Sequence, residues 1–206
     1  MDVMPAKETV LEFSRDVVIR HLEESIATKQ RLIAMGTEPI LEASRLVTGA
    51  FRNGNKLLLC GNGGSAGDCQ HIAAEFVSLL RLDFQRPGLP AIALTTDTSL
   101  LTASANDFGF EGVFARQVEA LGRSGDVLIG ISTSGNSKNV VAAFKTARER
   151  GISTIAMSGE GGGAIGAMAD ITIAVPSPVT QFIQESHIAI GHILCELVEC
   201  AVFPKQ

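Results

Sequence analysis

The spacing of apolar residues predicts two helices at the start of the chain. From about Lys7 to Met35, apolar side chains recur every three or four residues, which is typical of a helix with one apolar face. A second stretch of this kind runs from about Glu38 to Arg52 and ends at an Asn-Gly pair that favours a turn. We therefore expect residues 1–54 to form a helical extension in front of the rest of the fold.

Short apolar runs without alternation follow, separated by helical stretches. Such runs are typical of strands that are covered on both faces of a sheet. They are Lys56–Cys60, Ala91–Thr95, Asp126–Ile131, Ile152–Met157 and Ile171–Val175. The helical stretches lie at about 65–81, 99–121, 137–150 and 163–169. Alternating strands and helices form right-handed βαβ crossovers, so the sequence predicts an α/β fold with a mostly parallel five-stranded sheet between two helical layers.

The last segment, from about Thr180 to Phe203, is apolar almost all the way round. A helix of this kind needs cover on every side, which one subunit could not easily provide for both this helix and the N-terminal one. We expect a homo-oligomer in which the two helices pack across subunits, the alternative being a helix buried in its own domain. Residues 1–206 then form a single domain, in which residues 55–206 supply the α/β core and the C-terminal helix.

Composition narrows the classes of function. With 206 residues, 46% of them hydrophobic, the chain can bury the core of one large domain. A formal net charge of −5 comes without the basic stripe of nucleic-acid-binding proteins, and no window is long and apolar enough for a membrane span, so neither partner is expected. The four cysteines form no C-x-x-C pair and no secretory signal opens the chain, which favours a reducing, cytoplasmic setting with free thiols.

A glycine-rich loop, from Gly61 to Asp68, follows the first predicted strand and opens a helix. Glycines let the backbone approach a ligand closely, and a helix N-terminus offers free N–H groups to an anion. The loop partly matches the dinucleotide-binding fingerprint, so a nicotinamide-dependent oxidoreductase is one alternative, although its acidic residue would have to be Asp97, which lies too far along. Ser65 and Asp68 also fit a capping box, a purely structural role.

A second polar loop, from Ser132 to Ser137, lies at the end of the third predicted strand. It carries four hydroxyls and the amide of Asn136 at the start of a helix, although hydroxyl-rich turns are also common helix caps. In open parallel sheets, ligands bind beyond the carboxyl ends of the strands, where both loops lie. Together the two loops predict a cradle for a phosphate and for sugar hydroxyls.

Polar residues on two helices predict a metal or proton-transfer site. His71 and Glu75, four residues apart, share one face of the helix that the first loop opens. Gln184, His187 and His192 lie in the apolar C-terminal helix, where a polar group must either be satisfied by hydrogen bonds or serve a function. Imidazole and carboxylate donors at such spacing could bind Zn²⁺ or another borderline divalent ion, while spacing alone leaves the choice of ligands open.

Taken in order, the motifs resemble those of the phosphoheptose isomerases, which belong to the sugar isomerase (SIS) domain superfamily. They are Cys60-Gly-Asn-Gly-Gly-Ser65, His71-x-x-x-Glu75, Asn106-Asp-Phe-Gly109, Ser132-Thr-Ser-Gly-Asn-Ser137 and Gln184-x₇-His192. The resemblance covers essentially the whole chain and implies a three-layer, flavodoxin-like SIS domain in a cytoplasmic homotetramer. It also implies conversion of sedoheptulose 7-phosphate to D-glycero-D-manno-heptose 7-phosphate, the first step of ADP/GDP-heptose synthesis for lipopolysaccharide core or surface polysaccharide.

The resemblance also implies roles for individual residues. The residues implied to hold the sugar phosphate are Asn62, Gly63, Gly64, Ser65, Glu75, Asn106, Asp107, Ser132, Thr133, Ser134, Ser137 and Gln184. Those implied to surround one zinc ion per subunit are His71, Glu75, Gln184 and His192. Glu75 and His192 are implied to transfer protons through an ene-diolate, which needs a base at carbon and an acid at oxygen. The alternative is a non-enzymatic SIS-domain protein, either replication-initiator-binding or a sugar-phosphate-sensing regulator, which has no need of that pair.

Overall fold

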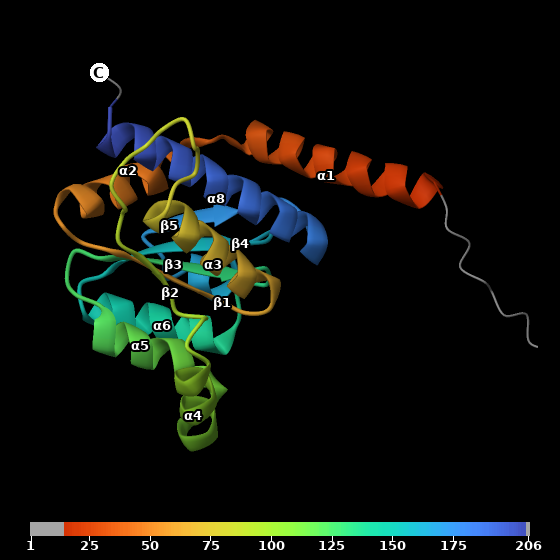
Figure 1. Cartoon of the computed structure of the whole chain (residues 1–206). Coiled ribbons are helices and arrows are strands. Elements are labelled where there is room, and N and C mark those ends of the chain that lie inside the picture. Colours follow the sequence, from red (N-terminus) through yellow and green to blue (C-terminus); the bar gives the residue numbers. More distant parts are fainter. Residues whose placement is uncertain (1–14, 205–206) are drawn as a thin grey trace, which may run out of the picture.

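Helices cover both faces of a parallel sheet in the computed structural model, which describes residues 15–204 (Figure 1). The five strands run in the order β2-β1-β3-β4-β5, and each neighbouring pair is parallel. Their bounds are β1 Leu57–Gly61, β2 Ala91–Ala93, β3 Val127–Ser132, β4 Ser153–Ser158 and β5 Ile171–Ala174. This strand order is typical of flavodoxin-like folds, so the expected three-layer α/β architecture is confirmed.

Two helical layers enclose the sheet. One face carries α2 (Glu38–Arg52), α3 (Gly64–Val77) and α8 (Thr180–Val202), with α1 (Arg15–Met35) packed on α8. The other carries α4 (Thr98–Phe108), a short 3-10 helix η1 (Phe110–Gly112), α5 (Val113–Leu121), α6 (Lys138–Glu149) and α7 (Gly163–Gly166). Because both faces are covered, β1 and β3 are buried along their whole length and read as continuous apolar runs.

The strand order also determines where a ligand can bind. β1 and β3 are neighbours, but the helix after β1 lies on one face of the sheet and the helix after β3 lies on the other. The loops that follow these two strands therefore diverge at the topological switch point, where doubly wound sheets bind their ligands. Both predicted polar loops lie there, at the carboxyl edge of the sheet.

The prediction of one continuous helix over residues 99–121 is wrong. The structure has α4, η1 and α5 in its place, and the chain turns between α4 and η1 at Gly109, whose φ is +86°. A glycine is favoured there because φ lies in the left-handed region. Asp97, the residue that a dinucleotide site would need, is the N-cap of α4, where its carboxylate accepts a hydrogen bond from the Leu100 N–H at 2.9 Å.

Helix α1 is covered on one side only. Its two buried residues are Ser25 and Thr28, and in Figure 1 it extends along α8 and past the end of that helix. The large apolar residues that it leaves exposed are Val17, Val18, Ile19, Leu22, Ile26, Ile33 and Met35. The first part of the predicted helix, residues 7–14, lies outside the described residues. Within the described part of its own subunit these apolar side chains stay exposed, whereas Leu32 of the same helix is partly buried against the core.

Helix α8 is covered mostly within its own subunit, by α1, α2 and α3. Its buried residues are Phe182, Ile183, Ser186, His187, Ile190, Gly191, Leu194, Cys195, Val198 and Glu199. The expectation of packing across subunits therefore rests on α1 more than on α8. Across residues 15–204, no helix combines the length and the apolar run that crossing a bilayer requires.

Candidate active site

His71, Glu75 and His192 meet between α3 and α8. The Nε2 atom of His71 lies 2.9 Å from Nε2 of His192 and 3.3 Å from Oε1 of Glu75. His71 and Glu75 are four residues apart on α3 and so share the face that looks toward α8. Ligand atoms of the three residues all lie within 4.8 Å of one another. The structure thus brings together the predicted catalytic pair and three of the four predicted metal ligands.

Close packing of the two helices makes this meeting possible. Gly191, which precedes His192 on α8, lies against Ile72, which follows His71 on α3. A Cβ atom at residue 191 would lie 2.7 Å from the Ile72 Cδ1 atom, closer than carbon atoms can pack. Only glycine lets the helices approach this closely without a shift, so Gly191 keeps the two imidazoles within reach of each other.

The three side chains have the chemistry of a divalent-cation site. Two imidazole nitrogens and a carboxylate oxygen are ligands that Zn²⁺ accepts in proteins. The Oε2 atom of Glu75 is buried and has no hydrogen-bond partner among the described residues. Burial of a carboxylate oxygen without a partner is costly, and a bound cation would remove that cost. The residues present therefore fit a divalent ion.

Gln184, the fourth predicted ligand, contacts the first turn of α3. Its amide rests against Gly64 at the start of α3, where a Cβ on that glycine would lie 2.5 Å from the Gln184 nitrogen. His71 follows seven residues later, about 10 Å along the helix axis at 1.5 Å per residue. The position of Gln184 beside the glycine-rich loop agrees with its predicted contact with substrate, and its role as a metal ligand stays a prediction.

The glycine-rich loop opens α3 without a side-chain cap. Gly63 is the N-cap residue, and Asp68 lies within the helix, so the capping-box interpretation of Ser65 and Asp68 is wrong. The reason is that the helix begins two residues earlier than that interpretation requires. The Oδ2 atom of Asp68 is buried without a partner among the described residues, and burial raises the pKa of this carboxyl. The Ala66 and Gly67 N–H groups both donate to the Gly63 carbonyl, at 3.0 and 3.2 Å, so the N–H groups that precede them are the ones that can bind an anion.

Three hydroxyls converge in the second polar loop. The Ser132 Oγ atom lies 2.9 Å from the Ser137 Oγ and 3.5 Å from the Ser134 Oγ. Ser137 is the N-cap of α6, but its side chain makes no capping bond. Thr133 uses its backbone carbonyl to accept the Gly159 N–H at 3.0 Å. The Ser134 Oγ also accepts the Asn136 N–H at 3.1 Å, so part of this group supports the turn itself, while the hydroxyls of Ser132 and Ser137 face each other.

The glycine cluster at 159–166, to which the sequence assigns no function, supports this loop. Gly135 has φ +66°, and a Cβ there would lie 2.1 Å from the Gly162 carbonyl oxygen. The Ile165 N–H donates to the Gly135 carbonyl at 2.9 Å, and the Ala164 N–H donates to the Asn136 side chain at 3.0 Å. The two loops therefore pack backbone to backbone, which neither loop reveals on its own.

Asn139 is a site residue that the sequence analysis missed. Its buried amide and that of Asn62 form a reciprocal pair, with N···O distances of 2.9 and 2.8 Å. The pair bridges the loop after β1 and the first turn of α6, across the switch point. The side chain of Asn62 is thus engaged by the protein, which leaves its backbone for the predicted contact with substrate. The sequence does contain a signal for it: Asn139 precedes Ala143 and Ala147 at four-residue spacing, which places a polar side chain on the buried face of α6.

Asn106 and Asp107 lie on the last turn of α4, exposed and bonded to each other at 2.9 Å. Helix α4 packs on η1 and α5, whereas the His71 cluster lies between α3 and α8. The segment is nevertheless held near the second loop, because Lys138 of α6 forms an ion pair with Glu111 of η1 at 2.7 Å. Contact of Asn106 and Asp107 with substrate stays a prediction.

The side chain of His187 is buried and hydrogen-bonded to the sheet, which indicates a structural role. It is fully buried on α8, and its Nε2–H donates to the Ser158 carbonyl at the end of β4, at 3.1 Å. Burial lowers the pKa of His187 to about 4, so the ring is neutral near pH 7. This hydrogen bond attaches α8 to the sheet beside the phosphate cradle.

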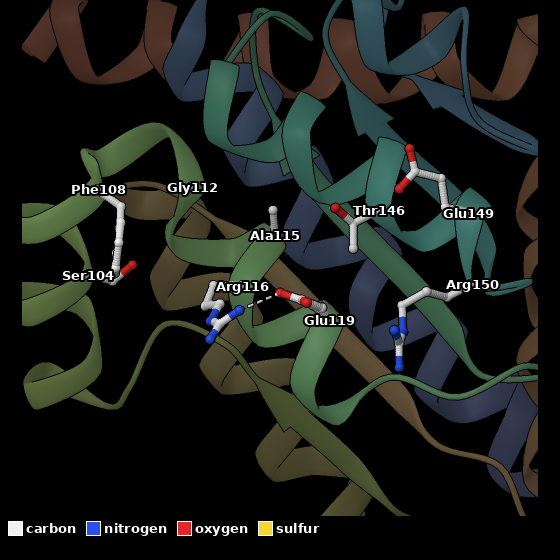
Figure 2. Close-up of a pocket in the computed structure, with 9 residues that line it drawn as sticks. All are labelled: Ser104, Phe108, Gly112, Ala115, Arg116, Glu119, Thr146, Glu149 and Arg150. Carbon is white, nitrogen blue, oxygen red and sulfur yellow. Dashed lines mark hydrogen bonds and ion pairs between the residues drawn. The ribbon is translucent and has the colours of Figure 1, made fainter.

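A groove of about 680 Å³ on the opposite helical layer is not part of this site (Figure 2). It runs over α4, α5 and α6 and contains none of the predicted site residues. Its charged lining is largely compensated, since Arg116 and Glu119 pair with each other at 2.7 Å and both are exposed. The candidate catalytic side chains, His71, Glu75 and His192, lie on the other face of the sheet, between α3 and α8.

Comparison with known proteins gives consistent matches. A family model for the SIS domain matches residues 20–159. The phosphoheptose isomerase of Roseiflexus sp. (strain RS-1) is 55% identical over 188 residues, which cover 91% of this chain and 94% of that protein. Phosphoheptose isomerase structures from Neisseria gonorrhoeae and Francisella tularensis share 48% and 37% identity with TM-scores of 0.84 and 0.85. Each alignment covers 89% of this chain and 97% of the solved chain.

Proposed function

The chain belongs to the SIS-domain family and, within it, to the phosphoheptose isomerases, and we propose that His71, Glu75 and His192 form its reaction centre. It is an isomerase that converts sedoheptulose 7-phosphate to D-glycero-D-manno-heptose 7-phosphate in heptose biosynthesis. The observation that carries the assignment of the centre is the meeting of a carboxylate and two imidazoles within 4.8 Å. A sugar-phosphate sensor has no use for such a cluster.

The cluster supplies what an aldose–ketose isomerisation needs. The reaction moves a proton between adjacent carbons through an ene-diolate, so it requires a base at carbon and a proton donor at oxygen. Glu75 takes the proton from one carbon and returns it to the neighbouring carbon. His192 donates a proton to the carbonyl oxygen and recovers one from the adjacent hydroxyl. His71, 2.9 Å from His192, holds that imidazole in place.

One zinc ion per subunit is held by His71, Glu75 and His192, with Gln184 as the fourth ligand implied by the resemblance. Support comes from the donor set and from the unpartnered Glu75 Oε2. When bound, a divalent cation polarises the substrate's carbonyl or hydroxyl oxygens. The two oxygens of Glu75 have different surroundings, since Oε1 faces His71 and Oε2 has no hydrogen-bond partner within residues 15–204. One oxygen can therefore serve as a ligand while the other takes the proton.

The phosphate and the sugar hydroxyls bind at the two polar loops. Oriented N–H groups at the starts of α3 and α6 and the hydroxyls around Ser132 hold the anion without a net positive charge. The substrate-contacting residues are Asn62, Gly63, Gly64, Ser65, Asn106, Asp107, Ser132, Thr133, Ser134, Ser137 and Gln184. The acidic net charge of the chain is therefore compatible with a phosphorylated substrate.

The function is tested by incubating the purified protein with sedoheptulose 7-phosphate and following the sugar phosphates by NMR. We expect an aldose phosphate to form, its formation to stop after prolonged chelation, and activity to return with Zn²⁺. Metal analysis before and after chelation checks that zinc was removed. Absence of turnover in the zinc-loaded protein overturns the proposed function, whereas full turnover by metal-free protein overturns the zinc site alone.

The N-terminal extension, residues 1–54, assembles a homotetramer in the cytoplasm. Support comes from the uncovered apolar residues of α1, of which Leu22 is 58% exposed and Ile26 57% exposed. Replacing Leu22 and Ile26 with glutamate is expected to shift the mass in light scattering from four chains to a smaller species. Glu24→Gln, at an exposed position on the same helix, is the control and should leave the mass unchanged. An unchanged mass in the double variant would contradict this assembly.

A further inference from the structure

A buried ion pair lies at the end of the helix that carries Glu75. The Nε atom of Arg86 donates to Oε2 of Glu199 at 2.8 Å, and the two side chains are only 1% and 2% exposed. Arg86 belongs to the segment between α3 and β2, and Glu199 to the last part of α8. The two side chains of this pair are the least exposed of the ion pairs described for residues 15–204. Such a pair is costly to desolvate, so its other contacts indicate what it does.

The remaining donors of Arg86 bind the last turn of α3. Its Nη2 donates to the backbone carbonyl of Glu75 at 2.8 Å, and its Nη1 donates to that of Phe76 at 2.8 Å and to that of Pro87 at 3.0 Å. The final carbonyls of a helix lack partners within the helix. One of the two helix carbonyls that Arg86 satisfies belongs to Glu75 itself.

The Phe76 carbonyl also accepts the Leu89 N–H, at 2.9 Å, whereas the bond to the Glu75 carbonyl from outside the helix is that of Arg86. The helix ends at Val77 without a C-terminal glycine in the left-handed region, and its last turn contains no basic residue. Helix ends fray, and Glu75 lies only two residues from this end. Because the direction of the Glu75 side chain is set by the backbone at that residue, fraying would move its carboxylate relative to His71.

The ion pair also joins the two helices that form the site. Glu199 lies seven residues after His192 on α8, close to two full turns, so both residues lie on the same face of that helix. Arg86 further lies over the ring of Phe203, 6.0 Å from its centroid. A single guanidinium thus connects the backbone of Glu75 to the helix that carries His192.

We propose that Arg86 and Glu199 are positioning residues, which hold the Glu75 carboxylate facing His71 and His192. This role rests on the proposed function of Glu75 as base and metal ligand. Neither residue touches the substrate, because the contacts of both are with the protein interior. Their loss should therefore act on the chemical step and on metal retention, and only weakly on substrate binding.

The test compares Arg86→Lys and Glu199→Gln with the wild type. Lysine keeps the charge but lacks the planar fork that spans the two helix carbonyls and the carboxylate. Glutamine keeps an oxygen acceptor and removes the charge. For each variant we expect kcat to fall about 10–100-fold, KM to stay within about twofold, and zinc to be lost to a competing chelator about 10–100-fold more readily. If Arg86→Lys does not fold, the kcat, KM and zinc retention of Glu199→Gln alone decide whether the ion pair positions Glu75.

A second buried pair supplies the matched control. Lys56 and Asp126 form an ion pair at 2.5 Å at the opposite edge of the sheet, and Asp126 is 2% exposed. Lys56→Met should lower the melting temperature but leave kcat, KM and zinc retention unchanged. The positioning role is overturned if Arg86→Lys and Glu199→Gln behave like Lys56→Met. If the wild type does not turn over sedoheptulose 7-phosphate, the proposed function fails separately, and zinc retention still decides whether the pair positions Glu75.

Discussion

Replacing Glu75 with glutamine should abolish isomerisation while leaving the protein folded and able to bind the sugar phosphate. Glutamine has nearly the same shape but cannot accept a proton from carbon, so the ene-diolate cannot form at a useful rate. Loss of a positioned general base is expected to lower kcat about 10²–10⁴-fold. The NMR assay with sedoheptulose 7-phosphate measures turnover, and calorimetric titration with the substrate measures binding.

Glu119→Gln is the matched control for this variant. Glu119 is exposed on α5, forms an ion pair with Arg116 in the groove of Figure 2, and lies on the other side of the sheet from the α3–α8 cluster. It should retain wild-type kcat. Substantial activity in Glu75→Gln would show that another group removes the proton. Asp68 would then be the next candidate base, since its buried Oδ2 lies on the same helix and has no hydrogen-bond partner in the described part of the chain.

Replacing Gly135 with alanine should disable the phosphate cradle. The new Cβ would lie 2.1 Å from the Gly162 carbonyl oxygen, and no flexible side chain is present to give way. The left-handed φ of +66° adds about 1–2 kcal/mol of strain for any residue with a Cβ. The loop must therefore shift, moving the hydroxyls of Ser132 and Ser134. We expect kcat/KM to fall about 10–100-fold, mainly through KM, together with a lower melting temperature.

Gly161→Ala separates the effect of backbone strain from the effect of the clash with Gly162. Gly161 also has a left-handed φ, +80°, but nothing lies within 4 Å of the position its Cβ would take. This variant should lose stability through strain and keep a nearly normal KM. If Gly161→Ala and Gly135→Ala raise KM equally, contact between the two loops does not determine the shape of the cradle.

The sequence predicts features that depend on short-range patterns. Continuous apolar runs such as residues 127–132 identify the buried strands, because both faces of each are covered. The spacing of His71 and Glu75 places them on one helix face whatever surrounds that helix. The break at Gly109 was missed because apolar residues continue at helical spacing on either side of it, and the pattern contains no information on φ.

Features that depend on distant contacts could not be predicted in this way. Arg86 follows α3 in a segment without regular structure, and only the packing of α8 brings Glu199 to it. The contact between Gly135 and Gly162 likewise joins two loops that follow different strands. Asn139 shows an intermediate case, since its place on the buried side of α6 is visible in the sequence, whereas its partner Asn62 is not.

Helix α1 makes folding and assembly of the proposed tetramer parts of one equilibrium. Its polar contacts to its own subunit include those of His21 and Ser25 with Glu185, and most of its large apolar side chains are exposed among the residues that the structure describes. An isolated helix is only marginally ordered in water, so in the proposed tetramer contacts with neighbouring subunits would add to the free energy that orders α1. By mass action, dilution then reduces the order of α1 as well as the number of tetramers. For the proposed tetramer, a melting temperature is therefore defined only together with the concentration of chains.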